Sequence, residues 1–567
     1  MKHRILLIDL CIIVLGALLF VTGIGGVRLF DWDEINFAES AREMILTGDW
    51  FNVQINFESF WEKPPLFIWM QALSMKVFGI GEFAARFPNA VMGIITLLTL
   101  FHIGYKTENT RFGILWAGLY AISFLPFFYF KSGIIDPWFN YFIFLGIYFF
   151  SRYTDEGAAG LRTRHAALSG LFTGLAVLTK GPVGFLIFAL TFFVWLVVFR
   201  KFRLDFKWKD VAVYVAMLAL AGGAWFIALA ASGHSEVIKD FIDYQIRLFE
   251  TKDAGHGGFL LYHFVILLFG VTPASFLALS SLKRKPLQGE EDSRTAGLFR
   301  WMMTSLWVVL ILFTIVRTKI VHYSSFCYFP ITFLGAWAAA RMMDGKIKFS
   351  WWHRALLIAT AAFYGIVLTG LTLFDHFKHL IVPLVDDPFA VSCMEASSEW
   401  KGFEPFVGLI LIACTVWFCI RFNKNRKTSD FIPLAAGNLL FAMTAILCAV
   451  PEVEKYSQAS AVDFYIERQG EDCYVQPAYF KSYAQYFYTG RQPENTCEDF
   501  EWLSKGPLDK PCYFVVKDIP EHVERFKEDA PDAEFLYRRS GFQFFVRKEP
   551  SGGNEAEPDD GNKAEVE

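Results

Sequence analysis

Charged residues are scarce in this 567-residue chain, where Asp, Glu, Lys and Arg together make up 19% of the sequence. A soluble protein of ordinary makeup has about 25%. Acids and bases also nearly cancel, to a formal net charge of −4, so no basic face that would attract nucleic acid is indicated. Hydrophobic residues instead reach 54%, and the mean hydropathy is +0.35. These proportions exclude an ordinary soluble domain and indicate an integral membrane protein.

Cysteine is also sparse, and none of the nine residues stands at the Cys/His spacing of a zinc site. Five lie in apolar stretches, where a buried thiol usually acts as a small hydrophobe. The other four are Cys393, Cys473, Cys497 and Cys512. An even number is compatible with disulfides in an oxidising compartment, but the spacing does not give the pairing. The sequence names no cofactor and no metal ligands, and it leaves a divalent cation requirement open.

Apolar windows long enough to cross a hydrocarbon core of about 30 Å recur along most of the chain. The first is too long for a signal peptide and lacks a small-residue cleavage site, so we expect it to remain as a span. Between the fifth and sixth windows, Lys180-Gly181-Pro182 must form a tight turn. Thirteen spans are predicted, at residues 5–26, 87–104, 112–130, 134–150, 166–178, 182–199, 211–231, 259–282, 301–316, 326–340, 355–373, 406–420 and 431–450.

Lysine and arginine in the short loops predict the orientation of these spans. With a cytoplasmic N-terminus, every short basic loop falls on one side, including the clusters at 200–209 and 283–285. The opposite, outer face then receives most of the unusual polar residues, at 31–86, 131–136, 180, 232–258, 317–323, 375–401 and everything after 450. In a bacterial inner membrane this outer face is the periplasmic one.

Three parts are predicted along the chain: a transmembrane region at 1–450, a small domain at 451–548 and a tail at 549–567. In the small domain, strand patterns begin near Cys473, Cys512 and Phe542 and alternate with helical stretches. The tail is rich in Gly, Glu and Asp, so we expect it to be disordered. The predicted fold class is therefore an all-α polytopic membrane protein with a small C-terminal soluble α/β domain.

Two adjacent acids, Asp33 and Glu34, open the first outer segment. Ionisable residues at a membrane boundary are costly to desolvate and often mark functional sites. Asp33 precedes a helical run at 35–46 whose apolar positions predict an amphipathic helix on the membrane surface. Asp33 could serve only as a helix cap, but capping does not need a second acid. Both acids are candidate catalytic residues.

Lys63 lies between Glu62 and two prolines on the outer side, where the positive-inside rule makes lysine less expected. A lysine beside lipid can simply extend its amine to the interface, but its point charge also suits a phosphate. Other outer segments add cations, histidines and an acid, each of which has a structural explanation when taken alone. The candidates for contact with a donor phosphate or substrate are Glu62, Lys63, Asp136, Lys180, His256, Arg317, Lys319, His322 and Tyr323. Together they predict a lipid-phosphate site with an acid beside it.

The first 340 residues carry an ordered set of motifs: Asp33-Glu34, Phe37-Ala38-Glu39, Ala41-Arg42-Glu43-Met44, Gly48-Asp49-Trp50, Glu62-Lys63-Pro64-Pro65-Leu66, Ala84-Ala85-Arg86-Phe87-Pro88, Leu178-Thr179-Lys180-Gly181-Pro182 and Lys319-Ile320-Val321-His322-Tyr323. As an ordered set they resemble the motifs of bacterial membrane glycosyltransferases. These enzymes are similar to the 4-amino-4-deoxy-L-arabinose lipid A transferase and, more distantly, to dolichyl-phosphate-mannose protein mannosyltransferases. The sequence departs from the arabinose transferase pattern at Trp32, where that pattern has proline, and at Ile320 and His322.

This resemblance implies a GT-C fold of about thirteen spans and a sugar donor linked to polyprenyl phosphate. It implies transfer with inversion on the outer face of the inner membrane, to lipid A or to a protein hydroxyl. It also implies a catalytic role for Asp33, with Glu62, Lys63, Lys180, Lys319 and Tyr323 near the donor phosphate or the site wall. The alternative is a transporter or flippase of a lipid-linked or anionic substrate, which would place its site near the midplane between related halves.

The predicted orientation can be tested with periplasmic reporter fusions. A reporter fused after Pro451 should be active, and one fused after Lys427 should be inactive, because the last predicted span separates them. Equal activity at both points would contradict the orientation and the placement of the candidate residues in one compartment.

Overall fold

The computed structural model describes residues 2–155, 160–200, 206–250, 258–282 and 293–548. The chain divides into two compact units. Unit 1 comprises Met1–His376 and Ser398–Val453, and unit 2 comprises Phe377–Ser397 and Glu454–Glu567. The candidate residue His256 and the tail predicted to be disordered lie outside the described residues.

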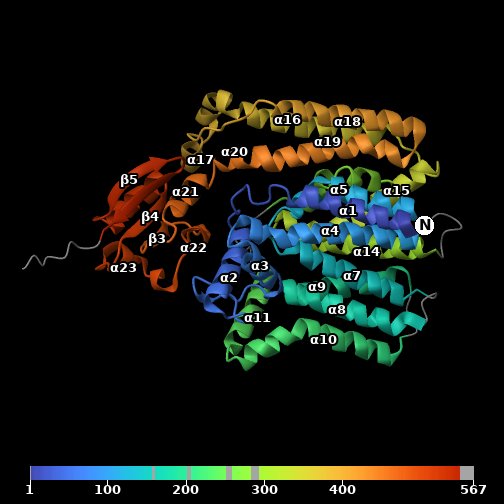
Figure 1. Ribbon diagram of the computed structural model, residues 1–567, viewed down its shortest axis with the longest axis horizontal. Helices are drawn as coiled ribbons and strands as arrows, with labels where there is room; N and C mark the ends of the chain where they lie inside the picture. The colour runs from blue at the N-terminus through green and yellow to red at the C-terminus, as the bar shows by residue number, and fades with distance from the viewer. Residues whose placement is uncertain (1, 156–159, 201–205, 251–257, 283–292, 549–567) are drawn as a thin grey trace, which may run out of the picture. The chain divides into compact units, whose positions relative to one another are not determined.

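Unit 1 is helical, and its long helices run side by side (Figure 1). Its only β-structure among the described residues is the hairpin of β1 (Gln54–Ile55) and β2 (Glu58–Ser59). The first helices are α1 (Lys2–Val21), α2 (Asp33–Thr47), α3 (Leu66–Phe78), α4 (Glu82–Thr107), α5 (Thr110–Ile122), α6 (Phe124–Tyr129), α7 (Asp136–Tyr153), α8 (Arg162–Lys180), α9 (Val183–Val198), α10 (Trp208–Ala231) and α11 (Ser235–Glu250). They are followed by α12 (Tyr262–Gly270), α13 (Ala274–Ala278), α14 (Arg294–Ile315), the 3-10 helix η2 (Val321–Cys327), α15 (Tyr328–Met343), α16 (Trp351–Ile381), α18 (Glu404–Asn425), α19 (Phe431–Thr444) and α20 (Val450–Glu454).

Seven of the described helices are long and apolar enough to cross a membrane. They begin with α1 and include the long segments 351–384 and 428–454. Several other predicted spans are shorter or interrupted. The window 112–130 is divided at Ser123, whose backbone is extended between α5 and α6. The window 259–282 is divided between α12 and α13, where Pro273 has no N–H to continue the helix. The count of thirteen spans therefore stays a prediction.

The tight turn predicted at residues 180–182 is present between α8 and α9. Gly181 has a φ of +90°, which a residue without Cβ adopts at little cost. Its amide donates to the carbonyl of Val177 at 2.8 Å and completes the end of α8. The turn brings Lys180 to the end of a helix, as the sequence indicated.

The prediction that residues 35–46 form a surface helix was wrong in one respect. The helix exists as α2, but its side chains from Glu34 to Met44 are all buried. Polar residues can lie inside when each is paired, and α2 contains such pairs, including Arg42 with Glu39 at 2.7 Å. A packed helix with internal ion pairs carries the same sequence pattern as an amphipathic surface helix.

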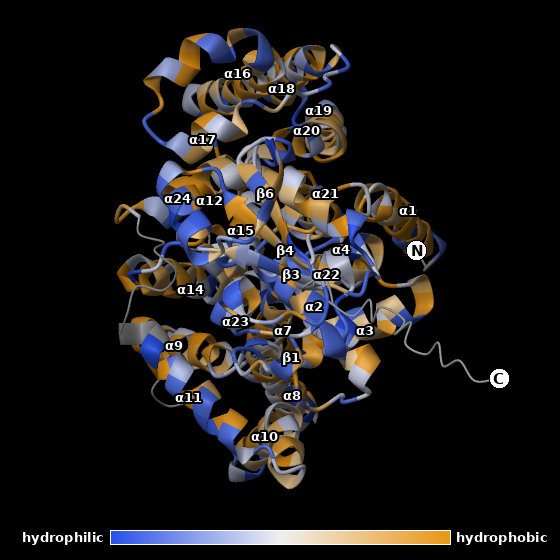
Figure 2. Ribbon diagram, turned by 90° about the vertical axis from the view of Figure 1, so that its left-hand side faces the viewer, coloured by the Kyte–Doolittle hydropathy of each residue, from blue (hydrophilic) through white to orange (hydrophobic). Residues whose placement is uncertain are grey.

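Aromatic rings fill much of the interior of unit 1. Trp116, Trp301 and Trp337 are among its largest fully buried side chains, and Phe144 stacks on Phe329 with ring centroids 4.5 Å apart. Stacked and edge-on rings at such distances contribute beyond their buried area. In contrast, α1 and α10 expose large apolar side chains, and their ribbons are coloured largely as hydrophobic (Figure 2). Such surfaces suit contact with lipid.

Unit 2 contains a four-stranded sheet in the order β3-β4-β6-β5. β3 (Tyr474–Ala478) pairs in parallel with β4 (Cys512–Lys517), whereas β6 (Phe542–Arg547) is antiparallel to β4 and to β5 (Glu534–Arg539). The three predicted strand patterns lie in β3, β4 and β6. Its helices include α17 (Pro388–Cys393), α21 (Ala459–Glu467), α22 (Ala484–Thr489), α23 (Phe500–Lys505) and α24 (Pro520–Asp529).

One part of unit 2 was not anticipated by the domain boundary predicted at residue 450. The segment Phe377–Ser397, which precedes α18, belongs to this unit. Ser392 donates to the carboxylate of Asp518 at 2.5 Å, and Arg538 bridges Asp518 and Glu395. The contacts of Ser392 with Asp518 and of Glu395 with Arg538 join residues more than a hundred positions apart, which no local pattern reveals. All nine cysteines are free thiols in the structure, so it contains none of the disulfides that the sequence left open.

Candidate functional site

Asp33 is the first residue of α2 and does not cap it. The cap position is Trp32, and no side chain provides a capping hydrogen bond there. The side chain of Asp33 is 34% exposed, and its Oδ2 lies 3.3 Å from Nε2 of His322. A carboxylate that is partly exposed and oriented by an imidazole can accept a proton from a substrate.

His322, on η2, connects several of the candidate residues electrostatically. Burial lowers its pKa, the cations Lys180 and Lys63 lower it further, and the carboxylates of Asp136 and Asp33 act in the opposite direction. Because the net shift is downward, the imidazole is neutral near pH 7. A neutral ring protonated at Nε2 can donate to Asp33 and hold its orientation. Four of the predicted residues thus act on one histidine, as a common site requires.

Lys180 and Asp136 form a close ion pair beside this histidine. Nζ of Lys180 lies 2.6 Å from Oδ1 of Asp136, which is in the first turn of α7. The second oxygen of Asp136, Oδ2, is buried and has no hydrogen-bond partner among the described residues. The ring of Tyr323 lies 5.6 Å from Nζ of Lys180. The structure therefore brings together three residues that the sequence placed in separate outer segments.

Lys63 has looser contacts than Lys180. Its Nζ lies 3.7 Å from Oε2 of Glu62, and the aromatic ring of Tyr244 is 5.1 Å away. The hydroxyl of Tyr244 donates to the same oxygen of Glu62 at 3.3 Å, and Arg247 lies over the same ring. A lysine held at this distance from its acid keeps hydrogen-bond donors for another anion.

Sequence reasoning missed Tyr244, on α11. A signal was present, because Val237, Phe241 and Tyr244 recur at helical spacing and are all buried. That pattern identifies a packed face, and only the fold shows that this face meets Glu62 and Lys63.

The prediction that Lys319 contacts the donor phosphate is not supported by its contacts. Its Nζ donates to three backbone carbonyls at the end of α14, those of Phe313, Thr314 and Val316, at 2.6–2.8 Å. An ammonium group has three donors, so Lys319 is occupied in satisfying the end of a helix. Arg317, two residues after α14 ends, has an exposed side chain.

Glu34 is also placed differently from its predicted catalytic role. It is 2% exposed, and its two oxygens accept from Nε and Nη2 of Arg86 at 2.9 and 2.8 Å. The amides of Phe30 and Gly133 also donate to this carboxylate. Glu34 is thus buried, and four donors occupy its two oxygens. These contacts support a structural, positioning role for Glu34, and the catalytic role predicted for it stays a prediction.

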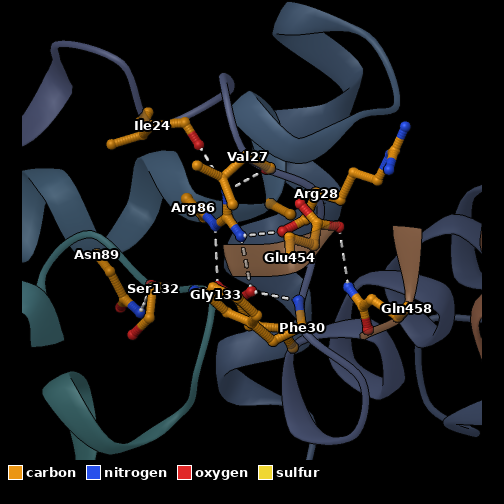
Figure 3. Close-up of polar contacts among 12 residues, drawn as sticks. Ile24, Val27, Arg28, Phe30, Arg86, Asn89, Ser132, Gly133, Glu454 and Gln458 are labelled. Atoms are coloured by element: carbon orange, nitrogen blue, oxygen red, sulfur yellow. Dashed lines mark hydrogen bonds and ion pairs between the residues drawn. The ribbon is translucent and has the colours of Figure 1, made fainter. Parts of the chain in front are cut away.

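Arg86 also binds the chain before α2 (Figure 3). Its Nη1 donates to the carbonyls of Ile24 and Val27 at 2.9 and 2.6 Å, and its Nη2 donates to that of Arg28 at 2.8 Å. Together with the two bonds to Glu34, these contacts use all five donors of the guanidinium. The segment that enters α2, and with it Asp33, is thereby fixed.

The turn before α7 is held in the same region. Nδ2 of Asn89 donates to the carbonyls of Ser132 and Ile134, both at 2.7 Å (Figure 3), and the amide of Gly133 donates to Glu34. Asp136 follows directly. Buried side chains of α2 and α4 thus determine where both Asp33 and Asp136 lie.

The described residues contain no group of three or more His, Cys, Asp or Glu side chains that could hold a metal ion.

At the level of sequence, the chain is similar to membrane glycosyltransferases in two comparisons with known proteins. Residues 62–227 match the family model described as dolichyl-phosphate-mannose-protein mannosyltransferase. A protein of Shewanella sediminis named undecaprenyl phosphate-alpha-4-amino-4-deoxy-L-arabinose arabinosyl transferase is 27% identical over 74% of this chain and 73% of its own length. A protein of Pseudomonas fluorescens with the same name, numbered 2, is 25% identical over 80% of this chain and 83% of its own.

The fold matches a solved structure over nearly its whole length. The crystal structure of ArnT from Cupriavidus metallidurans bound to undecaprenyl phosphate covers 95% of this chain and 97% of its own, with a TM-score of 0.75 and 15% identity. The apo form of that protein gives a TM-score of 0.71. At this identity the likeness shows the fold alone. The resemblance to membrane glycosyltransferases noted in the outer-segment motifs is confirmed.

The burial of the Arg86–Glu34 pair predicts a large effect of breaking it. Arg86→Ala should lower the free energy of unfolding by about 3–5 kcal/mol, because an uncompensated carboxylate would remain in the interior. Thermal melting of the purified protein in detergent measures the change. The control is Arg111→Ala, which removes a partly exposed pair with Asp344 and should cost about 0–1 kcal/mol. Equal shifts for the two variants would contradict the structural role of Arg86.

Proposed function

We propose that this chain is an inner-membrane glycosyltransferase that moves a sugar from polyprenyl (undecaprenyl) phosphate to an envelope acceptor. The observation that carries the proposal is the cluster around His322, where Asp33 lies within 3.3 Å and Lys180, Lys63 and Asp136 act on the same ring. An acid beside several cations suits a phosphate leaving group and a hydroxyl nucleophile. The fold shared with ArnT and the names of the sequence relatives support the same reaction class.

The acceptor that we propose is lipid A or a protein hydroxyl on the periplasmic face. The names of the arabinosyl transferase relatives state an undecaprenyl phosphate-linked sugar donor. The motif resemblance to the lipid A transferase favours a lipid A acceptor, and the matched mannosyltransferase family model favours a protein. In this proposal the N-terminus is cytoplasmic, unit 2 is periplasmic and the spans number about thirteen. The separation of basic loops from the candidate residues supports that orientation.

The donor phosphate is assigned to Lys63 by comparing the three lysines. Lys319 uses its donors on the end of α14, and Lys180 is committed to Asp136 at 2.6 Å. Lys63 is only 3.7 Å from Glu62 and retains donors for a phosphate. As the sugar leaves, negative charge grows on the phosphate, so a fixed cation stabilises the transition state more than the ground state.

Asp33 activates the acceptor in this mechanism. Its carboxylate takes the proton of the acceptor hydroxyl while that oxygen attacks the anomeric carbon. The bond from that carbon to the phosphate oxygen breaks, and the polyprenyl phosphate departs with the electron pair. Attack opposite the leaving group inverts the anomeric configuration. Where the acceptor is an ionised phosphate, no proton needs removal, and Asp33 with His322 serves to position it.

A transporter or flippase is the competing interpretation, and the observations favour it less. The charged candidates lie at helix starts and ends, with Asp33 and Asp136 in first turns and Lys180 at the last residue of α8. A midplane site between repeated halves would need a different arrangement. The two activities differ in product, because only a transferase releases free polyprenyl phosphate. That release should be measured with purified protein in nanodiscs, a sugar-linked donor and each acceptor.

The identity of the acceptor can be resolved in cells. Mass spectrometry of lipid A and of envelope glycoproteins from a deletion strain would show which linkage is lost. A strain that loses neither modification would count against both proposed acceptors.

Asp33→Asn retains the size of the side chain and removes its charge. We expect turnover to fall by about a hundredfold or more, the usual scale for losing general acid–base catalysis, while expression and donor binding persist. Asp240→Asn removes an exposed carboxylate from α11 and should leave turnover unchanged. Near-normal turnover in Asp33→Asn would remove Asp33 from the mechanism.

Lys63→Ala tests the phosphate contact. A charge-assisted hydrogen bond contributes about 1.5–3 kcal/mol, so donor binding should weaken roughly tenfold or more and the rate should fall with it. Lys63→Arg should retain only part of the donor binding and of the rate, because the planar guanidinium of arginine replaces the point charge of lysine. Product release measured across donor concentrations gives the donor KM and kcat. Lys239→Ala, at an exposed position on α11, is the control. An unchanged donor dependence in Lys63→Ala would move the phosphate site to Lys180.

A further inference from the structure

The motif Ala41-Arg42-Glu43 has no part in the mechanism described so far, although it lies in α2 close to Asp33 in sequence. Three of the charged side chains of α2 are almost completely buried: Glu39 and Glu43 are 0% exposed, and Arg42 is 2% exposed. Two acids and one base in the interior are costly unless each has a partner. Their partners therefore indicate what the cluster does.

Arg42 forms an ion pair with Glu39. Its Nε and Nη2 donate to the two oxygens of Glu39 at 2.8 and 2.7 Å, one turn away on the same helix. Glu43 binds a different part of the chain. The backbone amides of Asn56 and Phe57 donate to its two oxygens at 2.6 and 2.9 Å. The charge of Glu39 is thus balanced locally, and Glu43 reaches the β1–β2 hairpin.

The hairpin turn at that point is sterically demanding. Ile55 pairs with Glu58, so Asn56 and Phe57 are the two turn residues, and their φ values are +59° and +60°. Two successive residues with positive φ are typical of a type I′ turn, which favours Asn at the first position and Gly at the second. Phe57 has a Cβ and is disfavoured in this conformation. Glu43 supplies hydrogen bonds that are available only when the turn adopts it.

The hairpin leads directly to the cation assigned to the donor phosphate. After the turn, Ser59 accepts a hydrogen bond from Asn52 at 2.9 Å, and the amide of Phe60 donates to Val53 at 2.7 Å. Lys63 follows three residues later. The position of Lys63 therefore depends on the hairpin, and the hairpin depends on its turn.

We propose that Glu43 is a positioning residue that holds the β1–β2 hairpin and thereby places Lys63 against the donor phosphate. This inference rests on the proposed function for its catalytic consequence. The structural part of the inference, that Glu43 orders the hairpin, does not depend on the proposed function. The motif is then explained as one acid that neutralises Arg42 and a second acid that binds a strained turn.

Glu43 performs this role as a neutral acid. Burial, together with the nearby charge and hydrogen bond of Glu39, raises the pKa of Glu43 to about 9. At neutral pH its carbonyl oxygen accepts from one turn amide, and its hydroxyl oxygen accepts from the other while donating its proton to Glu39. Glutamine has the same length, one acceptor oxygen and an amide that can donate to Glu39, but its NH2 group cannot accept from the second turn amide. Glu43→Gln should therefore lose only part of the function, whereas Glu43→Ala should lose most of it.

The first test is a double-mutant cycle on product release. Glu43→Ala should raise the donor KM and lower kcat about tenfold, and Glu43→Gln should stay within about threefold of the unchanged protein. In a Lys63→Ala background, Glu43→Ala should add less than a twofold loss, since residues that act through one another are not additive. Glu58→Ala, at an exposed position on the same hairpin, should have no effect. Losses that multiply in the double variant would overturn the proposal.

The second test does not depend on catalysis. Hydrogen exchange of peptides covering residues 52–63 should be faster in Glu43→Ala, with α4 and α7 unchanged. Adding Phe57→Gly should restore part of the slow exchange and part of the activity, because glycine adopts positive φ at little cost. If Glu43→Ala does not fold, Glu43→Gln, which keeps only one acceptor for the two turn amides, should show a smaller acceleration that Phe57→Gly again offsets. Unchanged hairpin exchange in Glu43→Ala, or in Glu43→Gln where the alanine variant does not fold, would overturn the inference. Absence of polyprenyl phosphate release by the unchanged protein would overturn only the proposed function.

Discussion

The buried ion pair between Arg86 and Glu34 is the interaction on which the site depends. Its two ends hold different pieces of chain: Arg86 binds the carbonyls of the segment before α2, and Glu34 binds the amide of Gly133 before α7. In a dry interior neither charge is stable without the other. The two partners therefore fix each other and, with them, the starts of α2 and α7. The acids at those starts, Asp33 and Asp136, obtain their positions from this pair.

The same constraint explains why α2 is so rich in charge yet so little exposed. Each buried acid has a specific partner, which is a guanidinium for Glu34 and Glu39 and a pair of backbone amides for Glu43. Asp33 and Lys63, which the proposed reaction uses, are not tied up in this way: Asp33 is 34% exposed, and Lys63 lies 3.7 Å from its acid. Lys63 and Lys319 show the contrast, since identical side chains have different contacts in the fold.

Irregular backbone carries much of the site. Asp136 follows the turn at 131–135, Lys180 precedes the turn at Gly181, and His322 belongs to the short helix η2. Such segments leave backbone groups that side chains must satisfy, as Asn89 does for Ser132 and Ile134. Functional groups at the ends of rigid helices can be placed accurately while remaining open to a ligand.

The sequence by itself determined the class of the protein, the positions of most helices, the turn at Gly181 and the set of polar residues from which the site is drawn. These properties depend on composition, hydropathy and local spacing, which are all present along the chain. It could not show that Glu34 is buried against Arg86 whereas Asp33 is partly exposed, or that Lys319 binds backbone carbonyls whereas Lys63 does not. Each pair has the same chemistry and similar surroundings in sequence. It also missed Tyr244 and the segment Phe377–Ser397, whose partners are distant along the chain. Only the tertiary structure decided these points, because the role of a charged group is determined by the partner that burial assigns to it.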